Sequence, residues 1–300
     1  MARPIGVDLF SGAGGMSLGF EQAGFDVVAA VELDPVHAAV HKYNFPHCAV
    51  LPRSVTDVSG DDIRAAAEIG DRRVDVVFGG APCQGFSLIG QRALDDPRNS
   101  LVKDFVRIVR QLDASYFVFE NVKGLTVGKH RKFLFELIEE FEEAGYDVQK
   151  DWRVLNAADY GVPQDRQRLI LMGAKRGCDV PSYPAAIGER PTCDDALGDL
   201  PDAETFEELR MSDSVKTSAF GIPSKYAEAL RGLGNDAWAF GYPRKWDPNR
   251  LTSSARTEHT EISRRRFQET EQGRVEPISR LFKLPVDGVS NTLRAGTDSA

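Results

Sequence analysis

The chain has 300 residues, of which 42% are hydrophobic and 27% are charged, a composition typical of a soluble globular protein with one large domain, or one domain and a smaller one. Its formal net charge of −8 argues weakly against a nucleic-acid partner. No apolar run approaches the roughly 18 residues of a membrane-spanning helix, so we expect no membrane span.

Two further signals point to a reducing compartment. The chain opens directly on a strand-like segment without a basic region and apolar leader, so export is not expected. Its four cysteines (Cys48, Cys83, Cys178 and Cys193) form no CxxC pair, and neither a zinc site nor a disulfide framework is expected. We therefore expect a cytoplasmic protein that holds no metal.

Local charge differs from the average. Residues 189–213 carry nine acids and two bases, whereas residues 241–300 carry eleven bases and eight acids. Phosphate binding depends on local clusters of positive charge, so the basic C-terminal part remains a candidate phosphate-binding surface. An ordinary charged surface is the alternative.

The first 175 residues alternate between short apolar segments rich in β-branched residues and segments with a helical pattern. We predict strands at 5–10, 27–32, 74–80, 115–120, 148–155 and 168–174. We predict helices at 15–24, 34–43, 60–69, 99–112 and 130–145. This alternation is typical of an α/β fold, a Rossmann-like, mostly parallel sheet with helices on both faces.

The pattern changes after residue 175. Residues 181–204 are rich in proline and acid, and no clean period of either kind follows residue 240. We therefore predict a catalytic and cofactor-binding domain at 1–175. Residues 176–300 would form a linker and a smaller, irregular domain.

A glycine-rich turn, DLFSGAGG at 8–15, joins the first predicted strand to the first helix. Such a turn lets a ligand approach the backbone and meet the helix N-terminus. Glu32 ends the second strand and could accept hydrogen bonds from both hydroxyls of a ribose, and Asp57 could accept one from an adenine amino group. Ser17 stands where the dinucleotide fingerprint has its third glycine, and no phosphate-loop lysine follows. The pattern favours S-adenosylmethionine over NAD or ATP, and a tight turn without a ligand is the alternative.

Three further residue types follow strands of the same predicted sheet. Cys83 follows the strand at 74–80, Glu120 ends the strand at 115–120, and Arg166 and Arg168 lead into the strand at 168–174. A lone cysteine is usually a small buried hydrophobe. A cysteine beside a carboxylate, an arginine and a cofactor turn instead favours nucleophilic catalysis.

The ordered series DLFSGAGG, Glu32, APCQGFS (81–87), FENVKGL (119–125) and YGVPQDRQRLILMG (160–173) resembles the motifs of the DNA (cytosine-5) methyltransferases. The resemblance covers about residues 8–174. It implies the fold of S-adenosylmethionine-dependent methyltransferases with a smaller DNA-recognition domain. It also implies methyl transfer to carbon 5 of cytosine in double-stranded DNA, with S-adenosylhomocysteine as the second product.

The resemblance also implies roles for the catalytic residues. Cys83 would add to carbon 6 of the cytosine ring, Glu120 would hydrogen-bond or protonate N3, and Arg168, with Arg166 nearby, would hold the O2 carbonyl. The cofactor would lie near a set of residues at the strand ends. These are Phe10, Ser11, Gly12, Gly14, Gly15, Glu32, Leu33, Asp57, Pro82 and Leu101.

DNA contacts are implied at two places. The target nucleotide must swing out of the duplex, and Gln84, Ser87 and Arg92, in or just before the loop at 85–99, are candidates for filling the gap or touching phosphate. The Arg264–Arg265–Arg266 cluster in the basic C-terminal part is a candidate for phosphate and guanine contacts.

The chain departs from the family after GVSNTLRAGTDSA (288–300), because the family's late REAARL-like and GN(A/S)V segments are absent. We expect a truncated chain, or a second polypeptide that supplies these motifs. The alternatives are a tRNA cytosine-5 methyltransferase of the same fold and a catalytically incomplete DNA-binding module. An amino-directed enzyme is disfavoured because no (D/N/S)PP(Y/F) motif occurs. The expected setting is the bacterial cytoplasm at the nucleoid, alone or with a restriction endonuclease of a restriction–modification system.

Overall fold

The computed structural model describes residues 2–82, 99–128, 130–233, 240–242 and 247–293. It divides into two compact units. Unit 1 comprises residues 1–155, 167–184 and 239–243, and unit 2 comprises residues 156–166, 185–238 and 244–300. The predicted domain boundary at residue 175 stays a prediction.

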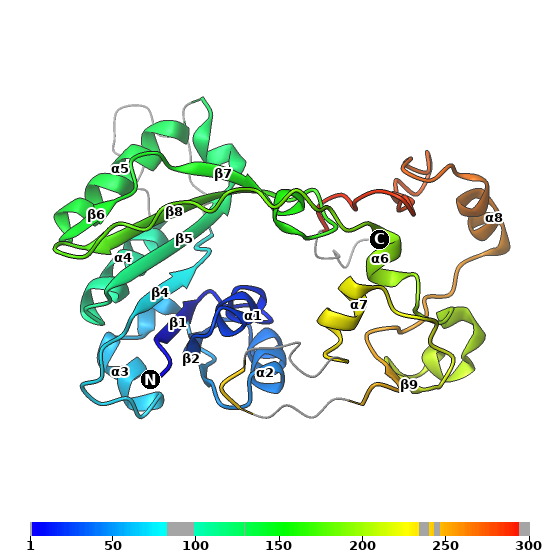
Figure 1. Ribbon diagram of the computed structural model, residues 1–300, viewed down its shortest axis with the longest axis horizontal. Coiled ribbons are helices and arrows are strands. Elements are labelled where there is room, and N and C mark those ends of the chain that lie inside the picture. The colour runs from blue at the N-terminus through cyan, green and yellow to red at the C-terminus, as the bar shows by residue number, and fades with distance from the viewer. Residues whose placement is uncertain (1, 83–98, 129, 234–239, 243–246, 294–300) are drawn as a thin grey trace. The chain divides into compact units, whose positions relative to one another are not determined.

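Unit 1 is built on one mixed sheet whose strands run in the order β3-β2-β1-β4-β5-β8-β6, with β7 paired to β8 (Figure 1). The pairs among β1 to β5 are parallel, and β8 runs antiparallel to both β5 and β6. The strands are β1 (Ile5–Leu9), β2 (Asp26–Val31), β3 (Ala49–Leu51), β4 (Val76–Gly79), β5 (Tyr116–Val122), β6 (Tyr146–Val148), β7 (Arg153–Asn156) and β8 (Gln167–Lys175). The predicted α/β class is therefore confirmed.

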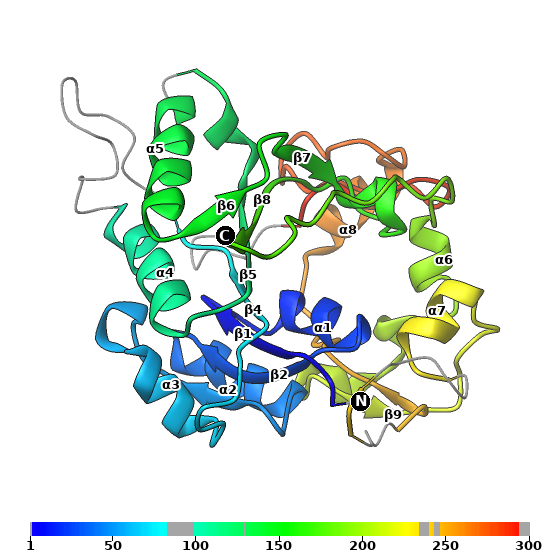
Figure 2. The same cartoon turned by 60° about the vertical axis from the view of Figure 1, so that its left-hand side comes forward.

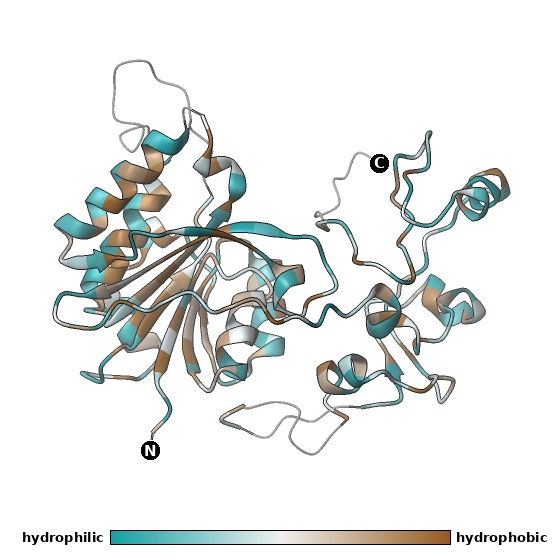
Figure 3. Ribbon diagram, turned by 45° about the horizontal axis from the view of Figure 1, so that its top comes forward, coloured by the Kyte–Doolittle hydropathy of each residue, from teal (hydrophilic) through white to brown (hydrophobic). Residues whose placement is uncertain are grey.

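Helices cover both faces of this sheet (Figure 2). They are α1 (Gly15–Gln22), α2 (Pro35–Asn44), α3 (Gly60–Ala66), α4 (Ser100–Gln111) and α5 (His130–Glu143). A larger apolar core joins the sheet to α3, α4 and α5, and a smaller one joins it to α1 and to Phe45, the residue that follows α2. On each face the aromatic ring of a helix residue stacks on the ring of a strand residue. Phe141 stacks on Phe117 with ring centroids 3.7 Å apart, and Phe20 stacks on Phe78 with centroids 3.8 Å apart. Figure 3 shows the hydrophobic residues concentrated along the central strands.

Three details differ from the sequence-based prediction. The single strand predicted at 148–155 is wrong, because residues 149–152, of which the first three are polar, separate β6 from β7. The three-residue strand β3 was missed because it is too short to show a period. Strand β5 continues to Val122, two residues beyond the end predicted at Glu120.

Unit 2 holds short elements around a small core of Leu209, Val215 and Leu251. Its helices and strands are α6 (Cys193–Leu197), β9 (Val215–Lys216), α7 (Lys225–Leu230), β10 (Arg250–Leu251) and α8 (Glu261–Glu269). Helix α8 was missed because no residue on it is buried, so it needs no apolar stripe. Its local signal is Thr260, whose side chain caps the helix by accepting from the Ser263 backbone.

Candidate active site

The carboxyl ends of the parallel strands bring the chemistry-bearing residues of unit 1 to one edge of the sheet. The glycine turn follows β1, Glu32 follows β2, residues 80–82 follow β4, and Glu120 lies near the end of β5. Strand β8 runs in the opposite direction, so its first residues lie at the same edge, with Arg168 paired to Val122. Such edges are where ligands bind in open α/β sheets.

The glycine turn has a crowded side and an open side. Phe10, Gly12 and Gly14 all have positive φ, at 59°, 52° and 98°. A Cβ on Gly14 would lie 2.2 Å from a ring carbon of Phe45, whereas Cβ atoms on Gly12 and Gly15 would meet no atom within 4 Å. The turn is therefore packed against α2 on one side, and the other side leaves room for a ligand close to the backbone.

Gly14→Ala is expected to weaken binding of S-adenosylhomocysteine by at least about tenfold, because the new methyl group must displace the Phe45 ring or the turn. Isothermal titration calorimetry measures this affinity, and a thermal melt reports folding. Gly24→Ala is a matched control, since Gly24 has a φ of 93° and a methyl group added there would meet no atom within 4 Å. Equal losses of affinity in the two variants would contradict the packing argument.

The Glu32 carboxylate anchors the turn. Its Oε2 accepts from the Gly12 backbone at 2.8 Å, and its Oε1 accepts from the Asp34 backbone at 2.9 Å. A carboxylate has about four acceptor positions, so each oxygen can still accept from a ligand hydroxyl. The buried Ser11 Oγ has no hydrogen-bond partner within the described part of the chain. An orphaned hydroxyl beside an open turn fits a ligand with polar groups at this place.

A buried pair holds the two ends of the turn together. The Ser17 hydroxyl on α1 donates to the Asp8 carboxylate on β1 at 2.7 Å, and both residues are at most 1% exposed. Burial raises the pKa of Asp8 to about 7, and the charge of Glu32 adds to this rise, while the hydrogen bonds from Ser17 oppose it. The serine in place of the fingerprint's third glycine thus binds the carboxylate that opens the motif.

Asp8 should make the free energy of unfolding depend on pH. Its folded pKa lies above the usual value of 3.8, so its contribution is fully present below about pH 4 and is lost as pH rises through 7. Between pH 5 and 8 we expect the free energy of unfolding of the protein to fall by about 3 kcal/mol relative to that of Asp8→Asn. Asparagine at this position keeps a hydrogen-bond acceptor but carries no charge. Urea unfolding of both proteins across this range measures the difference. Parallel pH curves for the two would show that Asp8 does not titrate in this way.

Glu120 lies between an arginine and a glycine backbone. Its Oε1 is 2.8 Å from Arg168 Nε, and the two side chains are 23% and 21% exposed. A Cβ on Gly80 would lie 2.7 Å from Glu120 Oε2, so only glycine leaves the carboxylate in this place. The pair can offer a carboxyl and a guanidinium side by side to one planar, polar ring.

Asn121 ties β5 to the segment that follows β4. Its Nδ2 donates to the Ala81 carbonyl at 2.9 Å, and the residue is 5% exposed. This bond holds residue 81 two positions before the predicted nucleophile. Neither Asn121 nor Gly80 was predicted as a site residue. Their only sequence signal is their place beside Glu120 and Cys83.

The structure does not test the roles predicted for several residues. Cys83, Gln84, Ser87 and Arg92 lie outside the described residues. Arg166 belongs to unit 2, where its backbone N–H donates to Asn156 Oδ1 at 3.0 Å. Leu33 is 70% exposed. Among the remaining cofactor candidates, Asp57 and Pro82 are exposed, and Leu101 is half-buried on the first turn of α4.

The arginines of α8 already form ion pairs or hydrogen bonds with other residues of unit 2. Arg264 lies 3.3 Å from Glu204, Arg265 lies 2.9 Å from Glu269, and Arg266 donates to the Ser263 hydroxyl at 3.2 Å. Exposed ion pairs of this kind are weak, so phosphate could replace the acids. The DNA contact predicted for these arginines stays a prediction.

Within the described ranges no cluster of three or more histidine, cysteine or acidic residues could hold a metal ion. No described helix is long and apolar enough to cross a membrane.

Comparison with known proteins gives a consistent result. The family model of C-5 cytosine-specific DNA methylases matches residues 6–280. The chain is 62% identical over 299 residues to the Type II methyltransferase M.XorII of Xanthomonas oryzae pv. oryzae, covering all of this chain and 70% of that protein. It is 44% identical over 198 residues to the Type II methyltransferase M1.HphI of Haemophilus parahaemolyticus, covering 65% of this chain and 52% of that protein.

A solved structure also matches nearly the whole chain. It is described as a DNA modification methyltransferase encoded within a prophage of E. coli, and it superposes with a TM-score of 0.73 at 29% identity. The match covers 97% of this chain and 82% of the other.

Proposed function

The chain belongs to the family of C-5 cytosine-specific DNA methylases, the DNA (cytosine-5) methyltransferases, and we propose that its sheet-edge site performs this reaction through Cys83, Glu120 and Arg168. The observation that carries the proposal is the Glu120–Arg168 pair, 2.8 Å apart, at the same edge as the glycine turn. Asn121 binds Ala81 there, directly before the Pro82–Cys83 segment.

The chemistry explains why these side chains are needed together. Carbon 5 of cytosine is a poor nucleophile. Addition of the Cys83 thiolate to carbon 6 turns the ring into an enamine that is nucleophilic at carbon 5. Glu120 donates a proton or hydrogen bond at N3 as electrons move into the ring, and Arg168 binds the O2 carbonyl. After methyl transfer a base removes the carbon 5 proton, and the thiolate leaves as the ring double bond re-forms.

Bound S-adenosylmethionine, the methyl donor that this family uses, supplies a methyl group on a sulfonium. Glu32 would bind the ribose hydroxyls with its remaining acceptor positions, and Asp57 would accept from the adenine amino group. The turn from Phe10 to Gly15 would face the rest of the nucleoside, with Leu33 against the base. Pro82 and Leu101 would line the methionine end. The open space at Gly12 and Gly15 and the orphaned Ser11 hydroxyl support this placement.

Double-stranded DNA is the proposed substrate, and the target cytosine would be flipped into the pocket. Gln84, Ser87 and Arg92 would contact DNA next to the flipped base, and Arg264, Arg265 and Arg266 would contact phosphates. We further propose that the enzyme needs no metal, yields S-adenosylhomocysteine, and acts at the bacterial nucleoid. The names of the relatives favour a cognate restriction endonuclease as its counterpart.

A methylation assay tests the proposal. The purified protein is incubated with radiolabelled S-adenosylmethionine and unmethylated genomic DNA, and the DNA nucleosides are resolved by mass spectrometry. The expected product is 5-methylcytosine in DNA. Label in N4-methylcytosine, or label only in a parallel tRNA sample, would contradict the proposal. Cofactor-dependent DNA binding without product would favour the binding module.

A further inference from the structure

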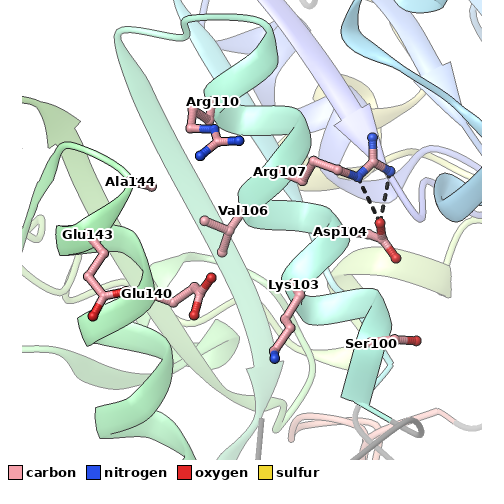
Figure 4. A pocket seen from close by; sticks show the side chains of 9 residues that line it. All are labelled: Ser100, Lys103, Asp104, Val106, Arg107, Arg110, Glu140, Glu143 and Ala144. Carbon is pink, nitrogen blue, oxygen red and sulfur yellow. Dashed lines mark hydrogen bonds and ion pairs between the residues drawn. The ribbon is translucent and has the colours of Figure 1, made fainter. Parts of the chain in front are cut away.

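One face of α4 holds the turn that carries Asp57. Arg107 lies in the middle of this face, and its Nε and Nη2 each lie 2.9 Å from Asp104 Oδ1, one helical turn earlier (Figure 4). Figure 4 shows the Arg107 side chain pointing away from α5, whose Glu140 and Glu143 line the other side of a cavity of about 600 Å³. Asp104 therefore fixes the direction in which the guanidinium fork points.

The fork reaches both ends of the turn η1 (Val55–Asp57). Arg107 Nη2 donates to the Val55 carbonyl at 2.8 Å, and Nη1 donates to the Val58 carbonyl at 2.9 Å. Gln111 extends the contact, since its Oε1 accepts from Arg107 Nη1 at 3.1 Å and from the Gly60 backbone at 2.9 Å. Residues 104, 107 and 111 thus attach η1 and the start of α3 to one helix face.

The turn has internal hydrogen bonds of its own. The Asp57 backbone donates to the Ser54 carbonyl at 3.0 Å, and the Thr56 hydroxyl donates to Ser54 Oγ at 2.7 Å. Two further bonds are long: the Thr56 backbone lies 3.3 Å from Ser54 Oγ, and the Val58 nitrogen lies 3.4 Å from the Val55 carbonyl. All of these join residues of one segment, whereas the two charge-assisted bonds from Arg107 attach that segment to α4, and such bonds are roughly twice as strong as neutral ones. Arg53 also donates to the Asp57 carbonyl, but it is exposed and belongs to the same loop. Arg107 is therefore the main polar anchor of η1 to a helix in the described part of the chain.

We propose that Arg107 is a positioning residue that holds the Asp57 carboxylate in place for recognising the amino group of adenine. The inference rests on the proposed function, which assigns Asp57 to the adenine. Asp57 is exposed and accepts only a 3.2 Å bond from the Thr56 hydroxyl among the side-chain bonds described, so its direction follows that of its backbone. Lysine cannot replace the fork, because one ammonium cannot bridge Asp104 and two carbonyls with the same geometry.

Binding measurements test the inference without catalysis. Isothermal titration calorimetry gives Kd for S-adenosylhomocysteine and for its analogue with hypoxanthine in place of adenine, which presents an acceptor where adenine has a donor. Arg107→Lys is expected to weaken S-adenosylhomocysteine binding about tenfold and the analogue much less, so the preference for adenine falls. Asp104→Asn should shift the preference in the same direction by less. Arg110→Ala is the matched control, one turn further along α4 at the same cavity and exposed.

An unchanged preference in Arg107→Lys and Asp104→Asn, with thermal melts like that of the unaltered protein, overturns the inference. So does an unchanged preference in Asp57→Ala, because Arg107 would then have nothing to position. Failure of the unaltered protein to bind S-adenosylhomocysteine contradicts the proposed function, and the inference falls with it.

Discussion

Glu120→Gln is expected to lower the rate of methyl transfer by about 10²–10⁴-fold, the range that a positioned acid or base contributes. Glutamine keeps the size of the side chain and can still contact Arg168 and Gly80, but it cannot move a proton at N3. The loss should therefore appear in the single-turnover rate with bound DNA. Affinity for S-adenosylhomocysteine should change little, because Glu32 and Asp57 bind that ligand in the proposed site.

Glu143→Gln provides the control for this loss of charge. Glu143 is an exposed acid of α5 in the same unit, and its replacement should leave the rate unchanged. If Glu120→Gln also retains at least a third of the rate, Glu120 does not act on the ring and the proposed mechanism fails.

Arg168→Met should lower the rate of methyl transfer by about 10²–10³-fold, as expected when one preorganised donor to a developing negative charge is removed. Methionine fills much of the space of arginine but offers nothing to O2. It also leaves Glu120 without the guanidinium 2.8 Å from its Oε1. Because the two side chains act on one ring, the losses in the double variant with Glu120→Gln should be smaller than the product of the single losses.

Single-turnover kinetics and DNA affinity separate this role from a structural one. Arg153→Met is the comparison, since Arg153 lies on β7, the neighbour of β8, and stacks on Tyr183. DNA affinity should be similar in both variants, and only Arg168→Met should be slow. Fully multiplicative losses with Glu120→Gln would mean that the two residues work independently.

The sequence determined the class of the fold because its apolar segments are long and regular. It also located Glu32 and Glu120 correctly at strand ends, since these acids directly follow apolar runs. The antiparallel direction of β8 could not be predicted in this way, because the direction of pairing depends on the neighbouring strands and leaves no periodic pattern in the sequence of the strand itself. That direction is what brings Arg168 to the end of β5.

The positioning residues were harder to find. Asn121 binds a carbonyl 40 residues earlier in the chain, and Arg107 binds two carbonyls about 50 residues earlier. Such contacts depend on the register of neighbouring elements, which single-sequence patterns do not encode. Ser17 was recognisable only as a departure from a glycine fingerprint, and its partner Asp8 followed from the structure.

Covalent attack by Cys83 on the cytosine ring can be tested by trapping the adduct. Duplex DNA in which 5-fluorocytosine replaces cytosine is incubated with the protein and S-adenosylmethionine, then denatured, digested and analysed by mass spectrometry. Fluorine cannot leave carbon 5 as a cation, so elimination is blocked and the adduct should persist. We expect a cofactor-dependent DNA–protein adduct on the peptide containing Cys83, and none in Cys83→Ala. An adduct on Cys48, Cys178 or Cys193, or 5-methylcytosine formed by Cys83→Ala at the unaltered rate, would contradict it.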